Sequence, residues 1–141
     1  MQKSELTKEI INSNLKKSKM KYLTYILLAL PLVYYAIKEL IKNINEGATP
    51  LIVFSAIGVL FVLCFIINFT KDIIIRNKYL IGEGTVKTAF YNQNKIESKV
   101  TINGLKGIIF STDSFTVGQN VYVIYNGKNA LMCYSKDKYY V

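Results

Sequence analysis

The most apolar stretch of the chain is residues 50–70, PLIVFSAIGVLFVLCFIINFT, which carries no charged side chain and ends abruptly at Lys71 and Asp72. A helix of this length covers about 30 Å, the thickness of the hydrocarbon core of a bilayer. Thr49 and Pro50 before it are typical of a helix N-cap and first helical residue. The sequence predicts a membrane span over 50–70, because a chain of 141 residues is too short to enclose a helix that is apolar on every face. The alternative is a helix buried in a soluble protein.

A second apolar run, residues 22–37, lies between Lys21 and Lys38. Tyrosines near both of its ends are typical of the aromatic belts at membrane interfaces: Tyr22, Tyr25, Tyr34 and Tyr35. No small-residue cleavage site precedes Lys38, which argues against a signal peptide. We therefore predict an uncleaved first span over residues 22–40. Pro31 removes a backbone donor in mid-run and predicts a kink against which a neighbouring helix packs.

The connection between the two spans, residues 41–49, is short and nearly neutral, so residues 22–70 must form an antiparallel helical hairpin. Six lysines lie in residues 1–21, whereas only two, Lys38 and Lys42, lie in or just before the connection. By the positive-inside rule, both termini are predicted to be cytoplasmic. The basic side chains predicted to contact the membrane surface are Lys16, Lys17, Lys19, Lys21, Lys71, Arg76 and Lys78.

Residues 1–21 combine lysines with apolar side chains at helical spacing. Leu6, Ile10, Ile11 and Leu15 share one face of a helix. This pattern predicts a basic amphipathic helix that lies on the membrane surface. A disordered lysine-rich tail is the alternative, because several Ser and Asn residues weaken the helix.

From residue 83 onward the pattern changes to the period of two that is typical of β-strands. Residues 96–102 alternate in polarity and lead to Asn103-Gly104, and two later apolar runs flank Asn126-Gly127. Both dipeptides are preferred in tight hairpin turns. Residues 71–82 form a juxtamembrane linker, of which 71–81 could continue the second span or open a strand. The predicted fold class is a two-helix transmembrane hairpin followed by a five- or six-stranded antiparallel β-barrel over 83–141, of the OB or SH3-like kind.

The sequence lacks most of the motifs that are typical of enzymes. The net charge is +9, but the chain has no His, and its two cysteines, Cys64 and Cys133, lie far apart in the sequence. A disulfide framework, a Cys/His metal site, a Ser-centred nucleophile motif and a Gly-rich phosphate loop are all missing. We therefore expect neither enzymatic activity nor a cofactor. The basic excess lies beside the membrane segments, so polymeric nucleic acid is not expected as a partner.

Tyrosines and lysines of the β-region give a candidate ligand or partner face: Tyr91, Lys95, Lys99, Lys106, Tyr122 and Lys128. Aromatic and basic side chains on a barrel face can stack bases and hold phosphates, so a nucleotide ligand is one interpretation. Cross-strand packing with a solvated rim is the other, because strands favour Tyr. Candidate helix-packing residues are Pro31 in the first span and the small residues Ser55, Ala56 and Gly58 in the second.

The order of elements also carries a resemblance. Two spans and a charged linker precede GTV at 84–86, VTING at 100–104 and VGQNVYV at 117–123. In this respect residues 50–141 resemble the small β-domain membrane proteins of bacteria, including the NfeD-like family, and equally a family of uncharacterised two-span proteins with a small β-domain. In the NfeD-like family an OB-type barrel follows membrane helices and is thought to work with stomatin-like scaffold proteins. The resemblance implies a membrane-anchored barrel that has a protein partner.

Two functions are consistent with the sequence. The first is a non-enzymatic membrane-anchored protein whose cytoplasmic barrel recruits or scaffolds a protein partner, with an immunity protein as a variant. The second is a membrane effector whose barrel senses a ligand such as a nucleotide messenger, and whose hairpins then oligomerise and permeabilise the bilayer. Two spans are too few to line a pore, so we expect self-association or another membrane protein as partner. The spans carry no internal charges, which argues against a transporter.

Overall fold

The computed structural model describes residues 2–141, and these residues form two units. The helical unit is Lys16–Ile74. The second unit, called the β unit below, combines the chain up to Leu15 with Ile75–Val141, so it is built from both ends of the sequence. The β unit is therefore larger than the predicted barrel domain of 83–141, because it also includes residues 75–82 and the N-terminal segment up to Leu15.

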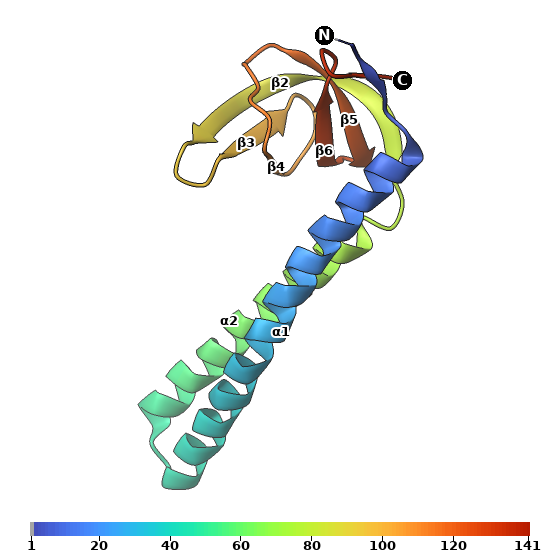
Figure 1. Ribbon diagram of the computed structural model, residues 1–141. Coiled ribbons are helices and arrows are strands. Elements are labelled where there is room, and N and C mark those ends of the chain that lie inside the picture. Colours follow the sequence, from blue (N-terminus) through green and yellow to red (C-terminus); the bar gives the residue numbers. More distant parts are fainter. Residues whose placement is uncertain (1) are drawn as a thin grey trace. The chain divides into compact units, whose positions relative to one another are not determined.

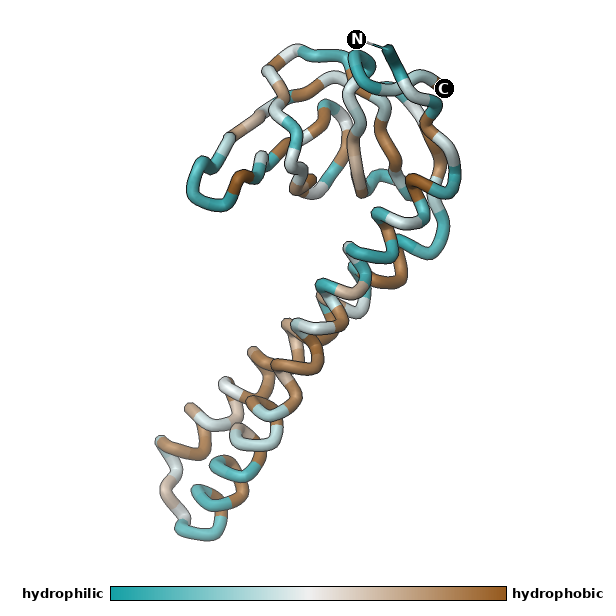
Figure 2. The backbone as a smooth tube through the Cα atoms, in the orientation of Figure 1, coloured by the Kyte–Doolittle hydropathy of each residue, from teal (hydrophilic) through white to brown (hydrophobic). Residues whose placement is uncertain are grey.

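The helical unit consists of two long helices, α1 (Lys8–Glu46) and α2 (Thr49–Ile74), and α1 begins inside the β unit. Both helices are long and apolar enough to cross a membrane. No residue of α2 is buried, and large side chains such as Leu28 (67% exposed) and Phe54 (73% exposed) lie open on the two helices. Figure 2 shows hydrophobic residues along both helices. Apolar surface of this extent is normally covered by lipid or by a partner, so the predicted association with a membrane is supported.

Helix α1 is longer at both ends than the predicted span of 22–40, and it continues without interruption through Pro31. Aromatic rings pack between the helices and along α2: the ring centroids of Tyr25 in α1 and Phe69 in α2 are 5.4 Å apart, and those of Phe61 and Phe65, both in α2, are 4.9 Å apart. Contacts of this kind add to the packing of two apolar helices.

The connection between α1 and α2 is closed by Asn43, whose side chain is only 4% exposed. Its amide donates hydrogen bonds to the carbonyl of Leu51 (3.3 Å) and to the hydroxyl of Ser55. Gly47 ends α1 with a φ of 66°, a conformation that glycine adopts without strain. Polar bridges across apolar helices hold them together, so Asn43 fixes the end of the hairpin.

The β unit contains a five-stranded sheet of order β4-β3-β2-β5-β6, in which all neighbours are antiparallel. Its strands are β2 (Leu80–Asn92), β3 (Glu97–Ile102), β4 (Ile109–Ser111), β5 (Asn120–Asn126) and β6 (Asn129–Ser135). Strand β2 serves two partners, because residues 80–85 pair with β5 and residues 86–92 with β3 (Figure 1). Lys106 nearly closes the sheet, since its amide donates to the carbonyl of Lys128 (2.7 Å) and its carbonyl accepts from Ala130 (2.8 Å). The predicted antiparallel barrel is confirmed.

The interior of the barrel is filled by alternate side chains of these strands: Val86, Val100, Ile102, Ile109, Val121, Val123 and Cys133 among them. Gly84 lies where these side chains crowd β2. A Cβ atom at Gly84 would be 2.8 Å from Cγ2 of Ile102 and 2.9 Å from Cγ2 of Val123. Glycine is therefore required here by the close approach of the core.

The outer face of β5 and β6 is covered by the N-terminal segment. Strand β1 (Ser4–Glu5) pairs in parallel with β7 (Tyr139–Tyr140). One buried cluster joins apolar residues of the N-terminal segment to those of the sheet: Leu6, Ile11, Leu15, Ile124, Leu131 and Tyr134. The prediction that this apolar face lies on the membrane surface is therefore wrong. Apolar side chains on both faces of β5 and β6 need a second cover, and the start of α1 supplies it.

The predicted turns differ in outcome. Gly127 and Lys128 form the tight connection of β5 to β6, with a φ of 60° at Gly127, so the hairpin at Asn126-Gly127 is confirmed. Asn103-Gly104 instead starts a longer connection, because β3 ends at Ile102 and β4 begins only at Ile109. The residues between them are used to bring Lys106 to β6. Residues 71–81 contain both predicted structures, since α2 ends at Ile74 and β2 begins at Leu80.

Candidate interaction surfaces

The outer face of β2, β3 and β4 carries an exposed row of three side chains, called the aromatic row below. Phe90 lies opposite Lys99, and Lys99 lies opposite Phe110, so the three residues share one face. Phe90 is 71% exposed and Phe110 41% exposed. The Nζ atom of Lys99 lies 5.9 Å from the ring centroid of Phe110, within range of a cation–π contact.

The structure divides the six residues of the predicted ligand or partner face. Lys99 belongs to the aromatic row, but Tyr91 follows Phe90 in β2 and therefore lies on the opposite face. Lys95 lies in the exposed loop between β2 and β3. A single face that includes all six residues is not formed.

The other three predicted face residues lie at two further places. Lys106 and Lys128 are exposed and adjacent, because their backbones form the hydrogen bond that closes the barrel. Tyr122 is half-buried beside the N-terminal cluster. Its ring lies 5.2 Å from Nζ of Lys136, which also forms a 2.9 Å ion pair with Glu83. Tyr122 is thus partly used in packing, and its role in a ligand surface stays a prediction.

The predicted membrane-surface residues occupy the helix ends nearest the β unit in sequence. Lys16, Lys17, Lys19 and Lys21 follow Leu15 in α1, and Lys71 lies in the last turn of α2. Lys78 is exposed in the connection to β2. Arg76 is only 7% exposed, so its side chain is unavailable to lipid headgroups and this part of the prediction is wrong.

The predicted helix-packing residues contribute unequally. Ser55 accepts the hydrogen bond of Asn43, and Ala56 is half-buried. Pro31 is exposed, and no atom lies within 4 Å of the position that a Cβ of Gly58 would take. Sequence reasoning missed Asn43, although a polar side chain near the end of an apolar helix, with Ser55 early in the next, is a signal for a polar bridge.

An apolar groove of about 350 Å³ lies within the helical unit. Its lining is aromatic and aliphatic: Tyr25, Leu28, Ala29, Leu32, Phe61, Val62, Phe65 and Phe69. The groove offers no polar group to orient a ligand, so it suits a hydrocarbon chain or another apolar helix.

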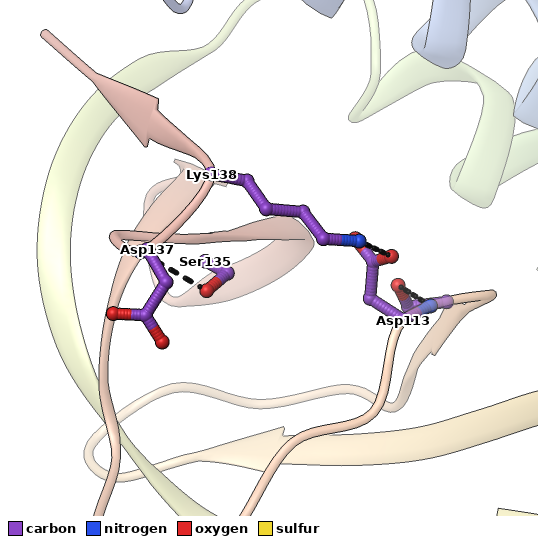
Figure 3. A network of polar contacts seen from close by, with 5 residues as sticks. Asp113, Ser135, Asp137 and Lys138 are labelled. Atoms are coloured by element: carbon purple, nitrogen blue, oxygen red, sulfur yellow. Dashed lines mark hydrogen bonds and ion pairs between the residues drawn. The ribbon is translucent and has the colours of Figure 1, made fainter. Parts of the chain in front are cut away.

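A polar network ties the connection after β4 to the turn before β7 (Figure 3). Nζ of Lys138 lies 2.6 Å from Oδ1 of Asp113, and this hydrogen bond and the carboxylate charge raise the pKa of Lys138. The backbone amide of Asp113 donates a hydrogen bond to the hydroxyl of Ser111, and that of Asp137 donates one to the hydroxyl of Ser135. Both hydrogen bonds are 3.2 Å long. These contacts order two loops, and an exposed pair of this kind contributes little to stability.

Two buried titratable groups of the β unit, Cys133 in the barrel interior and Tyr134 under the N-terminal segment, have raised pKa values. Burial, with a smaller effect of the charge on Asp113, raises the pKa of the Cys133 thiol to about 12. Burial also raises the pKa of Tyr134, although its hydrogen bond from Asn14 acts in the opposite direction. Within residues 2–141, no group of three or more His, Cys, Asp or Glu side chains is arranged to hold a metal ion.

No protein-family model, curated protein or solved structure matches the chain. The resemblance to the NfeD-like family therefore stays a prediction from the sequence.

Proposed function

We propose that this chain is a non-enzymatic membrane-anchored protein whose β unit recruits or scaffolds a protein partner through the aromatic row. The observation that carries the proposal is the pair of Lys99 and Phe110, a cation above an aromatic ring on an exposed face of the sheet. Aromatic rings beside cations are common centres of binding energy in protein interfaces.

The charge around the row favours an acidic partner. Besides Lys99, the β unit exposes two lysines at the closure of the barrel, Lys106 and Lys128. A basic surface of this kind attracts an acidic patch and speeds its association. The resemblance to the NfeD-like family favours a membrane scaffold protein of the stomatin type.

The anchor has a topology that fits this role. Ser4 pairs with Tyr139, so both ends of the chain belong to one folded unit and lie on one side of any membrane that the helical hairpin crosses. The lysines beside the helix ends favour the cytoplasmic side, in a bacterial cytoplasmic membrane. The β unit is then held at the membrane surface, where a partner meets it at high local concentration.

Affinity purification of the intact chain from membranes tests this function. Proteins that co-purify with the original chain are compared with those bound to Lys99→Glu and Phe110→Ser. Val117→Ser is the matched control, because Val117 is 68% exposed and lies outside the row. We expect both row variants to lose the same partner at least about tenfold while the control retains it. Equal recovery with all four proteins would contradict a role for the row.

A second candidate, the ligand-gated effector that oligomerises, is favoured by one feature of the helices. Helix α1 runs from the β unit into the helical unit without interruption, and the apolar groove of the helical unit could accept a helix of another copy. Purified protein in dye-loaded vesicles distinguishes the two functions. Dye release on addition of a cyclic nucleotide favours the effector, and intact vesicles favour recruitment.

A further inference from the structure

The end of the β2–β3 hairpin, residues 90–96, is apolar on more than one side and is called the hairpin tip below. Phe90 and Tyr91 are consecutive in β2, so their side chains lie on opposite faces, and they are 71% and 49% exposed. Ile96, in the turn immediately before β3, is 65% exposed. Figure 1 shows this end of the hairpin extending away from β5 and β6, so no other strand of the sheet covers it.

The backbone of the tip holds Ile96 in an unfavourable conformation. Ile96 has a φ of 49° and is the only non-glycine residue with a positive φ among residues 2–141. A β-branched side chain is poorly tolerated in this left-handed region, where Gly or Asn would be relaxed. A strained turn that presents an apolar side chain to water suggests that the side chain has a binding role.

The charge of the tip has one dominant sign. Residues 87–99 contain Lys87, Lys95 and Lys99 against Glu97 alone. The three lysines are exposed. Apolar side chains with lysines around them match the interfacial region of an anionic bilayer, where rings and aliphatic chains insert between lipids and ammonium groups contact phosphates.

We propose that the hairpin tip is a second membrane contact, which inserts Phe90, Tyr91 and Ile96 into the headgroup region of an anionic bilayer. A flat protein partner would cover one face of the hairpin, whereas a lipid interface surrounds it and covers both. Only residues 75–79 separate the end of α2 from the start of β2, so the β unit is held close to the bilayer in which the helices lie. This contact shares Phe90 and the charge of Lys99 with the aromatic row, whereas Tyr91, Lys95 and Ile96 belong to the tip alone.

A single tryptophan tests the proposal, because the chain has none of its own. Phe90→Trp is made in the full chain and reconstituted in vesicles of phosphatidylcholine with or without phosphatidylglycerol, each with brominated acyl chains as quenchers. The ring at this position is exposed, so the substitution leaves the core intact. We expect blue-shifted emission and at least about twofold quenching in the anionic vesicles, and weaker quenching after Lys95→Glu is added. Ile96→Trp should behave in the same way and serves if the first variant fails to fold.

Val117→Trp is the control, because Val117 is 68% exposed in the β unit but lies outside the tip. Its emission should stay that of a solvated indole in both kinds of vesicle. Solvated emission from positions 90 and 96 in the anionic vesicles would overturn the proposal and leave the tip free for a protein. Quenching at position 117 as strong as at position 90 would also overturn it, because the contact would then not belong to the tip.

Discussion

Asn14 donates a hydrogen bond of 2.8 Å from its side-chain amide to the hydroxyl of Tyr134, a residue 120 positions later in the chain. Tyr134 is 6% exposed, and its ring meets that of Tyr139 edge to face, with centroids 5.3 Å apart. This contact belongs to the layer in which the start of α1 covers β5 and β6. The N-terminal segment is therefore a structural part of the β unit.

Ile11→Ala should destabilise the β unit by about 3 kcal/mol, because Ile11 is fully buried in this layer and its removal leaves a cavity. Hydrogen exchange of β5 and β6 in the full chain in detergent measures the loss. Asn12→Ala is the control, since Asn12 is the exposed neighbour and should have little effect. Equal protection in both variants would show that the N-terminal segment is not packed on the sheet.

Asn43→Ala should loosen the connection between α1 and α2 by about 1 kcal/mol, the usual size of a polar contact between membrane helices. The substitution leaves Ser55 without its partner from α1. Faster amide exchange near the connection, measured in nanodiscs, is the expected result, and Asn45→Ala at an exposed position should not produce it. If amide exchange near the connection were as slow in the Asn43→Ala variant as in the original chain, Asn43 would not be what fixes the end of the hairpin.

The membrane spans and the barrel were predictable because each has a strong local pattern. Residues 50–70 exclude charge over a bilayer's thickness, and residues 96–102 alternate in polarity. The packing of the N-terminal segment was not predicted, since an apolar helical face with Ile11 and Leu15 can pack on lipid or on protein. The missed signal lies in β5 and β6, where VYVIY and ALMCY are apolar without alternation and so need cover on both faces.

The candidate site was harder to predict than the fold. Lys99 was identified, but Phe90 and Phe110 were not, because their common face depends on the register of three strands. Arg76 and Tyr122 resemble surface residues in sequence, yet Arg76 is buried and Tyr122 is partly used in packing. The barrel was predicted over residues 83–141, whereas that segment alone would expose Ile124, which the N-terminal layer buries completely.

Cys133 should make the stability of the β unit depend on pH in the alkaline range. Its pKa rises from 9.0 to about 12 on folding, so between these values the unfolded chain releases a proton that the folded chain keeps. The free energy of unfolding should therefore fall as the pH rises from about 9 toward 12. Cys133→Val, which has no thiol, should show a smaller fall in denaturant titrations, both proteins carrying Cys64→Ser. Parallel pH profiles would mean that the thiol is not buried as described.

Both ends of the chain should lie on the cytoplasmic side. A phosphatase reporter active only outside the cytoplasm should be silent when fused after Val141 and active when inserted beside Asn45, in the last turn of α1. Activity at Val141 and silence at Asn45 would reverse the proposed orientation. If reporters were fused to both ends of one chain and only one of them were active, the two ends would lie on opposite sides of the membrane. That result would contradict a single β unit built from both ends.

The most direct test of the proposed function is photo-crosslinking in membranes of the native host, with benzoylphenylalanine at position 110. Phe110 is 41% exposed at the end of the aromatic row, and Val117 provides the control position. We predict a discrete adduct with a different protein from position 110, absent from position 117 and lost when Lys99→Glu is added. An adduct between two copies of this chain would favour the oligomeric effector. Absence of any protein adduct at position 110, or the same adduct at both positions, would contradict recruitment through this face.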